Sequence, residues 1–315
     1  MSEKGINKRL NDRLMKALKA VNSVGGNSLT DEDLNRQRKG MELAGRLAAP
    51  SEGIEVSEVN IAGLACEFVR PELAHNPGYV ILYAHGGGYT CGGLSYARIL
   101  AAKLAISTGF STVSFAYRLA PENSFPAPVD DGMLVWEELR DRGYDAGRIL
   151  LAGDSAGGNL VLCLAERLVG ERGEIPAAIM LFSPWTDMTI TADTYDRYEE
   201  KDPILTRQYV TTVRDAYLKG QVRTADPKCS PLFGDFTDFP PTLIQVGRNE
   251  ILLHDSTALY ERMLEAGVPA VLDIEEDGWH VYQQMPLPMA GRAMKRLSRV
   301  ISDMIYNRSK GGELR

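Results

Sequence analysis

Short, continuous runs of apolar residues recur along the middle and the C-terminal part of the chain. Such runs are typical of strands that are buried on both faces. We predict strands at 79–84, 112–116, 149–152, 178–182, 242–246 and 270–274. Apolar residues between several of these runs have helical spacing, which predicts helices at 97–108, 128–141, 156–169 and 256–266. This alternation predicts an α/β fold, with a mostly parallel sheet and helices on both of its faces.

The N-terminal region has a helical pattern instead. Apolar side chains recur at helical spacing within residues 6–49, and a break at 24–28 divides the region into two predicted helices. Thr30, with Asp33 three residues later, matches the pattern of a helix N-cap. We expect these helices to pack on the core, either as a simple appendage or as part of a lid.

Two further segments depart from the alternation. Residues 55–61 and 64–69 predict a β-hairpin before the first buried strand. Residues 185–225 carry aromatic, acidic and helical sequence without a strand pattern, so we interpret them as an insertion over the carboxyl ends of the sheet. The predicted division is N-terminal cap helices at 1–49, a first core part at 50–184, a cap insertion at 185–225 and a second core part at 226–315.

Composition excludes several classes of protein. The 315 residues carry a net charge of −7 with a pI of about 5.3, which argues against a nucleic-acid partner or an anionic membrane surface. The sequence contains neither a signal-peptide pattern nor an apolar run of the ~20 residues that span a bilayer. Four scattered cysteines without a C-x-x-C motif predict reduced thiols in a cytoplasmic protein and no metal site. They are Cys66, Cys91, Cys163 and Cys229.

The segment Gly153-Asp-Ser-Ala-Gly157 lies between a predicted strand and a predicted helix. In this context G-x-S-x-G is typical of a tight turn that exposes a nucleophilic serine, here Ser155. The alternative is an ordinary glycine-rich loop that holds phosphate. A nucleophile also requires a general base, an acid and donors for an oxyanion.

His85-Gly-Gly-Gly88 directly follows the strand at 79–84. A glycine-rich loop on an earlier strand lets backbone N–H groups approach a tetrahedral oxyanion. We predict that Gly86 and Gly87 provide such donors, together with Ala156 after the nucleophile.

The chain has four histidines, and two of them follow Ser155. His280 lies in a loop after the last predicted strand and is the predicted base, with His254 at a helix start as the alternative. We expect His75 to lie on the surface and His85 to order the glycine loop.

The acid should follow a strand that lies between the serine and the base. Glu250 follows the strand at 242–246 and is the predicted acid, which would orient the imidazole and stabilise its protonated form. Asp255 is the competing candidate. If Glu250 is the acid, Asp255 would cap the helix that begins near Ser256.

With these motifs in place, the sequence resembles the hormone-sensitive-lipase-like family of α/β-hydrolase esterases. The shared segments are His85-Gly-Gly-Gly88, Tyr117–Glu122, Gly153–Gly158, Ser183-Pro-Trp-Thr-Asp187 and Ser230-Pro-Leu232. The resemblance implies an eight-stranded sheet, a helical cap, and hydrolysis of short- to medium-chain acyl esters. It also allows a homodimer through an edge strand. One departure is that Glu250-Ile-Leu stands where the family has a pattern like Asp-Pro-Leu, which keeps Asp255 as an alternative.

The predicted function is therefore that of a serine carboxylesterase that acts on a small-molecule ester without a metal or cofactor. Amide or peptide hydrolysis by the same mechanism is one alternative, and a non-catalytic small-molecule receptor on the same fold is another. Four residues are predicted to line the substrate pocket, with core or cap packing as the alternative for each. They are Tyr89, Trp185, Met188 and Tyr195.

Overall fold

A computed structural model describes residues 29–48, 52–73 and 75–308, together with residues 11, 13–16, 18 and 19. Eight strands form one sheet in the order β1-β2-β4-β3-β5-β6-β7-β8. The pairs β1–β2 and β2–β4 are antiparallel, and all the other pairs are parallel. The strands are β1 (Ile54–Ile61), β2 (Leu64–Pro71), β3 (Val80–Ala84), β4 (Ser111–Phe115), β5 (Ile149–Asp154), β6 (Ile179–Phe182), β7 (Thr242–Gly247) and β8 (Ala270–Glu275). The predicted strands and hairpin, and the mostly parallel eight-stranded sheet, are confirmed.

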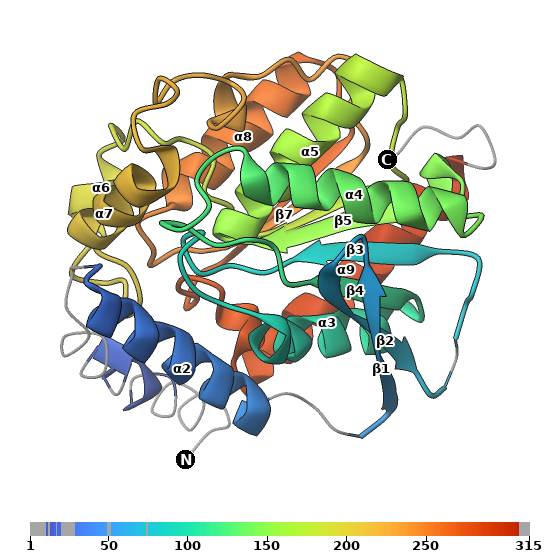
Figure 1. Cartoon of the computed structure of the whole chain (residues 1–315), viewed down its shortest axis with the longest axis horizontal. Helices are drawn as coiled ribbons and strands as arrows, with labels where there is room; N and C mark the ends of the chain where they lie inside the picture. The colour runs from blue at the N-terminus through green and yellow to red at the C-terminus, as the bar shows by residue number, and fades with distance from the viewer. Residues whose placement is uncertain are drawn as a thin grey trace.

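Helices cover both faces of the sheet (Figure 1). One face carries α3 (Leu94–Thr108) and α9 (Pro288–Arg308), and the other carries α4 (Ala127–Asp141), α5 (Ala156–Arg172) and α8 (Leu253–Glu265). Short 3-10 helices lie at Ala146–Arg148 (η1), Pro231–Phe233 (η2) and Tyr282–Gln284 (η3).

Alternating side chains of the strands fill two cores. In β3, Ile81 and Tyr83 pack with the helices α3 and α9, whereas Leu82 and Ala84 pack with α4 and α5. Successive side chains of a strand point to opposite faces, so a strand that is covered on both sides needs apolar residues throughout. This requirement explains the continuous apolar runs in the sequence.

The N-terminal helix and the insertion lie together at one end of the sheet (Figure 1). The helix α2 (Asp31–Ala48) begins after Thr30, whose Oγ1 accepts the N–H of Asp33 at 3.2 Å, as the N-cap pattern predicts. Gly45 lets α2 approach α3, because a Cβ there would lie 2.3 Å from the backbone of Ser95. The insertion contains α6 (Thr194–Arg197) and α7 (Arg207–Leu218), and no strand is assigned within it. Most of the earlier predicted helix lies outside the described residues, as does the predicted break at 24–28.

One long element was not predicted. The helix α9 buries Leu297, Ile301 and Met304 in the same core as α3. The spacing of these residues is helical, but α9 has no strand after it and falls outside the alternation on which the other predictions depended.

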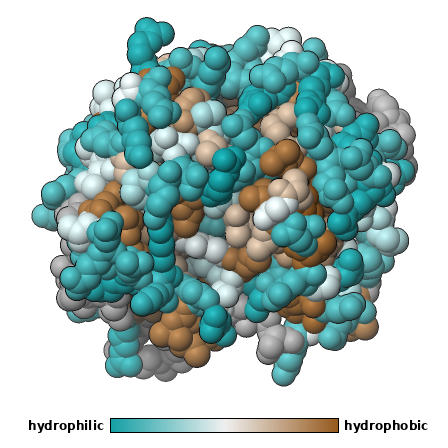
Figure 2. All heavy atoms as spheres, in the orientation of Figure 1, coloured by the Kyte–Doolittle hydropathy of each residue, from teal (hydrophilic) through white to brown (hydrophobic). Residues whose placement is uncertain are grey.

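Figure 2 shows a mostly hydrophilic face on which hydrophobic residues form separate patches. Among the described helices, none has the length and apolar character to cross a membrane. The four cysteines are buried and unpaired, as expected for reduced thiols.

Candidate active site

Ser155 occupies the sharp turn between β5 and α5. Its backbone φ is +53°, a left-handed conformation that is rare for residues other than glycine. An added Cβ at Gly157 would lie 2.1 Å from the carbonyl oxygen of Ala84, and one at Gly153 would lie 2.2 Å from that of Gly157. Both flanking glycines are therefore required for the close approach of β3, β5 and α5.

His280 reaches this turn from the loop after β8. Its Nε2 lies 3.0 Å from Ser155 Oγ, and its Nδ1 lies 3.2 Å from Glu250 Oε1. The side chain of His280 is 5% exposed and that of Glu250 is fully buried. Three residues that are far apart in the sequence, from the ends of β5, β7 and β8, thus form one chain of hydrogen bonds.

Glu250 is held on its other oxygen as well. Its Oε2 accepts the N–H of Gly247 at 2.7 Å and the hydroxyl of Ser183 at 2.8 Å. Ser183 Oγ in turn accepts the N–H of Val281, next to His280, at 3.1 Å. Ser183 therefore joins the carboxylate to the loop that carries the imidazole. We did not assign it this role from the sequence, where it stood only as the first residue of a family motif.

The charge around His280 favours its protonated form. Burial by itself lowers the pKa of His280, but the hydrogen bond and negative charge of Glu250 oppose this, with smaller contributions from Asp202 and Asp154. The net result is a pKa above the ordinary value of 6.5. The site can therefore stabilise an imidazolium when the imidazole accepts a proton from Ser155.

The competing candidates lie elsewhere. Asp255 is buried, and its carboxylate accepts the N–H groups of Thr186 and Asp187 at 2.8 and 2.9 Å. It is not the cap that we predicted, because α8 begins at Leu253 and has no side-chain cap. Burial raises the pKa of Asp255 to about 7. His254 and His75 are exposed and lie apart from the chain of hydrogen bonds.

His85 orders the glycine loop, as predicted. It is buried, its Nδ1–H donates to the carbonyl of Gly86 at 2.7 Å, and its ring stacks on Tyr117 with a centroid distance of 4.3 Å. Burial lowers the pKa of His85 to about 4, although the Gly86 carbonyl opposes this. The ring is therefore neutral at pH 7 and is not the base.

The predicted donor at Gly86 is not available to an oxyanion. Its N–H already donates to Asp154 Oδ1 at 2.9 Å, so this part of the prediction is wrong. Gly87 and Gly88 have φ values of +113° and +61°, and within the described part of the chain neither N–H has a protein acceptor. Ala156 is the first residue of α5, where N–H groups have no acceptor inside the helix. The free N–H donors of the loop are therefore those of Gly87 and Gly88, whereas we predicted those of Gly86 and Gly87.

Asp154 connects the serine turn to the glycine loop. Besides Gly86, its carboxylate accepts the hydroxyl of Tyr83, and its second oxygen lies 3.3 Å from Gln284 Nε2 and 3.5 Å from Tyr96 Oη. Burial raises the pKa of Asp154 to about 6, although the hydrogen bonds from Tyr83 and Gly86 oppose the shift. We did not identify this residue from the sequence, although its position directly before the serine was a usable signal.

Arg38 of α2 connects the N-terminal helix to the glycine loop. Its guanidinium donates to the carbonyls of Thr90 and Ala120 at 2.8 and 2.9 Å, and it makes a two-point contact with Glu122. The N-terminal helix thus reaches the residues that follow the free glycine donors.

The four predicted pocket residues are buried in the core on the side of the sheet that carries α4, α5 and α8. The hydroxyl of Tyr89 donates to Asn159 at 2.7 Å, and its ring stacks on Tyr217. The hydroxyl of Tyr195 donates to Asp255 at 3.0 Å. Trp185 and Met188 lie in the same core, and Trp185 Nε1 donates to the carbonyl of Asp187 at 3.2 Å. The structure supports core packing for these residues, which was the alternative to a pocket role.

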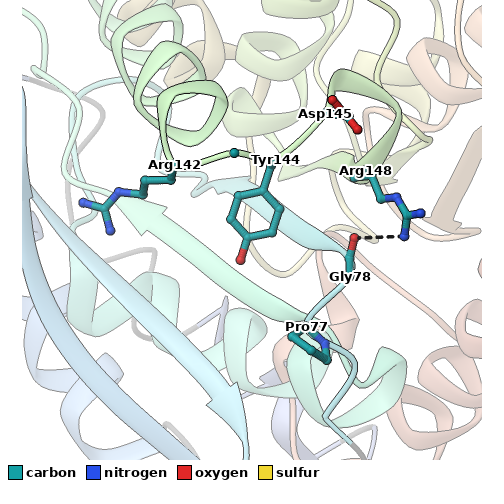
Figure 3. Close-up of a pocket in the computed structure, with 7 residues that line it drawn as sticks. Pro77, Gly78, Arg142, Tyr144, Asp145 and Arg148 are labelled. Carbon is teal, nitrogen blue, oxygen red and sulfur yellow. Dashed lines mark hydrogen bonds between the residues drawn. The ribbon is translucent and has the colours of Figure 1, made fainter.

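A cavity of about 410 Å³ lies away from this site (Figure 3). It is lined by Pro77 and Gly78, before β3, and by Arg142, Tyr144 and Arg148, before β5. These residues lie at the amino ends of the strands, whereas Ser155 follows the carboxyl end of β5. The cavity therefore has no part in the hydrogen-bonded chain.

Comparison with known proteins identifies the family. Residues 81–284 match the model of the alpha/beta hydrolase fold family. The chain belongs to this α/β-hydrolase family. It is 32% identical to an acetyl-hydrolase of Streptomyces hygroscopicus over 82% of this chain and 84% of that protein. It is 30% identical to an esterase of Acinetobacter venetianus over 79% and 82% of the two chains.

Comparison with solved structures shows a group of α/β-hydrolases to which this chain is similar. The crystal structure of an esterase from the bacterial hormone-sensitive lipase family has a TM-score of 0.86 with 32% sequence identity, and the match covers 94% of this chain and 98% of that one. The predicted resemblance to hormone-sensitive-lipase-like esterases is confirmed. The predicted enzyme class, a serine hydrolase of carboxylic esters, is confirmed with it.

Proposed function

We propose that the enzyme hydrolyses short- to medium-chain acyl esters through an acyl-enzyme on Ser155. The chain of hydrogen bonds from Ser155 through His280 to Glu250, at 3.0 and 3.2 Å, carries this proposal. His280 Nε2 takes the hydroxyl proton as Ser155 Oγ attacks the acyl carbonyl. The imidazolium then gives the proton to the leaving alcohol, and water cleaves the acyl-enzyme with the same residues in reverse roles. Glu250 holds the imidazole in the tautomer with the proton on Nδ1.

The oxyanion is stabilised by the N–H groups of Gly87, Gly88 and Ala156. All three lack a protein acceptor in the described chain. Ala156 directly follows Ser155, and the glycine loop approaches the same turn, because an added Cβ on Gly86 would lie 3.1 Å from Ser155 Cβ. Donors fixed by the fold stabilise developing charge without reorganisation, and losing one such donor typically costs ~10²–10³ in rate. The cap that we propose comprises α2 and residues 185–225, and Arg38 attaches α2 to the glycine loop.

The proposed substrate class rests on similarity together with the chemistry of the site. A similar protein is an acetyl-hydrolase. A profile of p-nitrophenyl acetate, butyrate, octanoate and palmitate should show its maximum kcat/KM among the shorter acyl chains. A maximum at palmitate would contradict the proposal.

The role of Ser155 is tested by Ser155→Ala, with Ser302→Ala as the matched control on the exposed side of α9. Ser155→Ala should lower kcat for p-nitrophenyl butyrate by at least about 10⁴-fold. Ser302→Ala should leave it unchanged. Wild-type turnover by Ser155→Ala would refute the mechanism. A p-nitroanilide of the same acid tests amide hydrolysis, and ester binding without turnover by the wild type would favour the receptor alternative.

A further inference from the structure

Asp202 is a buried carboxylate that the mechanism above does not use. It lies in the insertion between α6 and α7, and its side chain is 4% exposed. Its Oδ1 accepts the N–H groups of Ile204 and Leu205 at 2.8 and 3.1 Å, which closes a local turn. Its Oδ2 accepts a third N–H, that of Ile251, at 3.1 Å. This third bond leaves the insertion and reaches the residue directly after Glu250.

A second residue of the insertion holds the other side of Ile251. The hydroxyl of Thr194, at the start of α6, donates to the carbonyl of Ile251 at 2.8 Å. The N–H and the carbonyl of Ile251 are therefore both bonded to the insertion. More than 45 residues of sequence separate Ile251 from each of its two partners, Asp202 and Thr194. Ile251 can form the bond to Asp202 because it has an N–H, which a proline at this position would lack.

We propose that Asp202 is a positioning residue for Glu250, and that with Thr194 it makes the cap insertion part of the support for the acid. This inference rests on the proposed roles of Ser155, His280 and Glu250. Oε1 of Glu250 must stay within hydrogen-bond reach of His280 Nδ1, and the direction of the Glu250 side chain follows its backbone. A misplacement of about 1 Å in such a site can cost on the order of 100-fold in rate.

The charge of Asp202 adds a second effect. The charged groups that face His280 are Glu250, Asp202 and Asp154, and all three raise its pKa against the opposing effect of burial. Burial raises the pKa of Asp202 itself to about 6, while His280 lowers it and Glu250 raises it. Asp202 is therefore ionised above about pH 6, and its negative charge then favours the imidazolium form of His280.

The decisive variant is Asp202→Asn, which has the same shape without the charge. Its kcat for p-nitrophenyl butyrate should fall roughly 10- to 100-fold, with KM within about twofold of the wild type. The acidic limb of the kcat/KM profile should also move to lower pH, because His280 loses a neighbouring negative charge. A residue that only closed its own turn would not move this limb.

Thr194→Val separates the two effects. It removes the bond to the Ile251 carbonyl and no charge, so kcat should fall while the acidic limb stays in place. Asp215→Asn is the control, because Asp215 lies on α7 in the same insertion and is exposed. Asp202→Asn should also cost much less when Glu250 is already glutamine, because a residue that acts through Glu250 is not additive with it.

Wild-type kcat and an unmoved acidic limb in a folded Asp202→Asn protein would overturn the proposal. If that variant does not fold, wild-type kcat in Thr194→Val overturns it instead. Neither result would affect the proposed function, which is tested separately by the acyl-chain profile and by Ser155→Ala.

Discussion

The carboxylate of Asp154 accepts the N–H of Gly86 at 2.9 Å, so the residue before the serine is bonded to the first glycine of the loop. This bond fixes where the next two N–H groups point. An added Cβ on Gly86 would lie 2.5 Å from the same carboxylate, which shows how closely the two segments approach. The position of the proposed oxyanion donors therefore depends on a side chain that does not itself contact the substrate.

Asp154→Ala should lower kcat for p-nitrophenyl butyrate roughly 10- to 100-fold, because Gly86 loses its acceptor and the loop can shift. It should also lower the free energy of unfolding, since the Tyr83 hydroxyl and the Gly86 N–H are left buried without a partner at about 1–3 kcal/mol each. Asp154→Asn keeps an oxygen for both donors and should retain far more activity. Steady-state kinetics and urea unfolding of both variants check this, and equal kcat in the two would contradict it.

Glu250→Gln should lower kcat by on the order of 10³–10⁴-fold, because the amide can no longer hold the imidazole in the required tautomer. Asp255→Asn should leave kcat near the wild-type value, since Asp255 bonds to Thr186, Asp187 and Tyr195 and not to His280. The two substitutions are matched in chemistry and burial. The reverse ranking in the ester assay would make Asp255 the acid.

Asp255→Asn should also change how stability depends on pH. The folded-state pKa of Asp255, about 7, lies above the unfolded value of 3.8, so its ionisation favours unfolding. Its contribution to stability is fully present below pH 4 and is lost as the pH rises through 7. Relative to the wild type, Asp255→Asn should therefore gain stability in urea unfolding between pH 5 and pH 8. The prediction would be contradicted if the variant and the wild type differed in free energy of unfolding by the same amount at pH 5 and at pH 8.

The sequence predicted those features that depend on local pattern and order. The glycines at 153 and 157 were readable because a strand, a tight turn and a helix leave no room for a Cβ there. Glu250 and His280 followed from chain order and from their positions after strands, and the structure brings both to Ser155. Asp202 gave no signal, because its bond to Ile251 exists only after the insertion folds onto the sheet.

The direction in which backbone N–H groups and side chains point, in contrast, could not be predicted from residue type. A run of three glycines indicates a loop that approaches a ligand, but φ and ψ decide which N–H groups are free, and here Gly86 turns toward Asp154. Tyr89 and Tyr195 resembled pocket residues because aromatic side chains near a site are ambiguous. Their hydroxyls instead satisfy Asn159 and Asp255 inside the core.

The φ of +53° at Ser155 has a consequence for engineering. A non-glycine residue in such a conformation costs on the order of 1–3 kcal/mol, and glycine would be relieved of that strain. Selection for heat resistance alone would therefore favour Ser155→Gly, which lacks the catalytic hydroxyl. Directed evolution of this enzyme therefore needs an activity assay in every round, because the residue that is required for activity at position 155 is not the one that gives the highest stability.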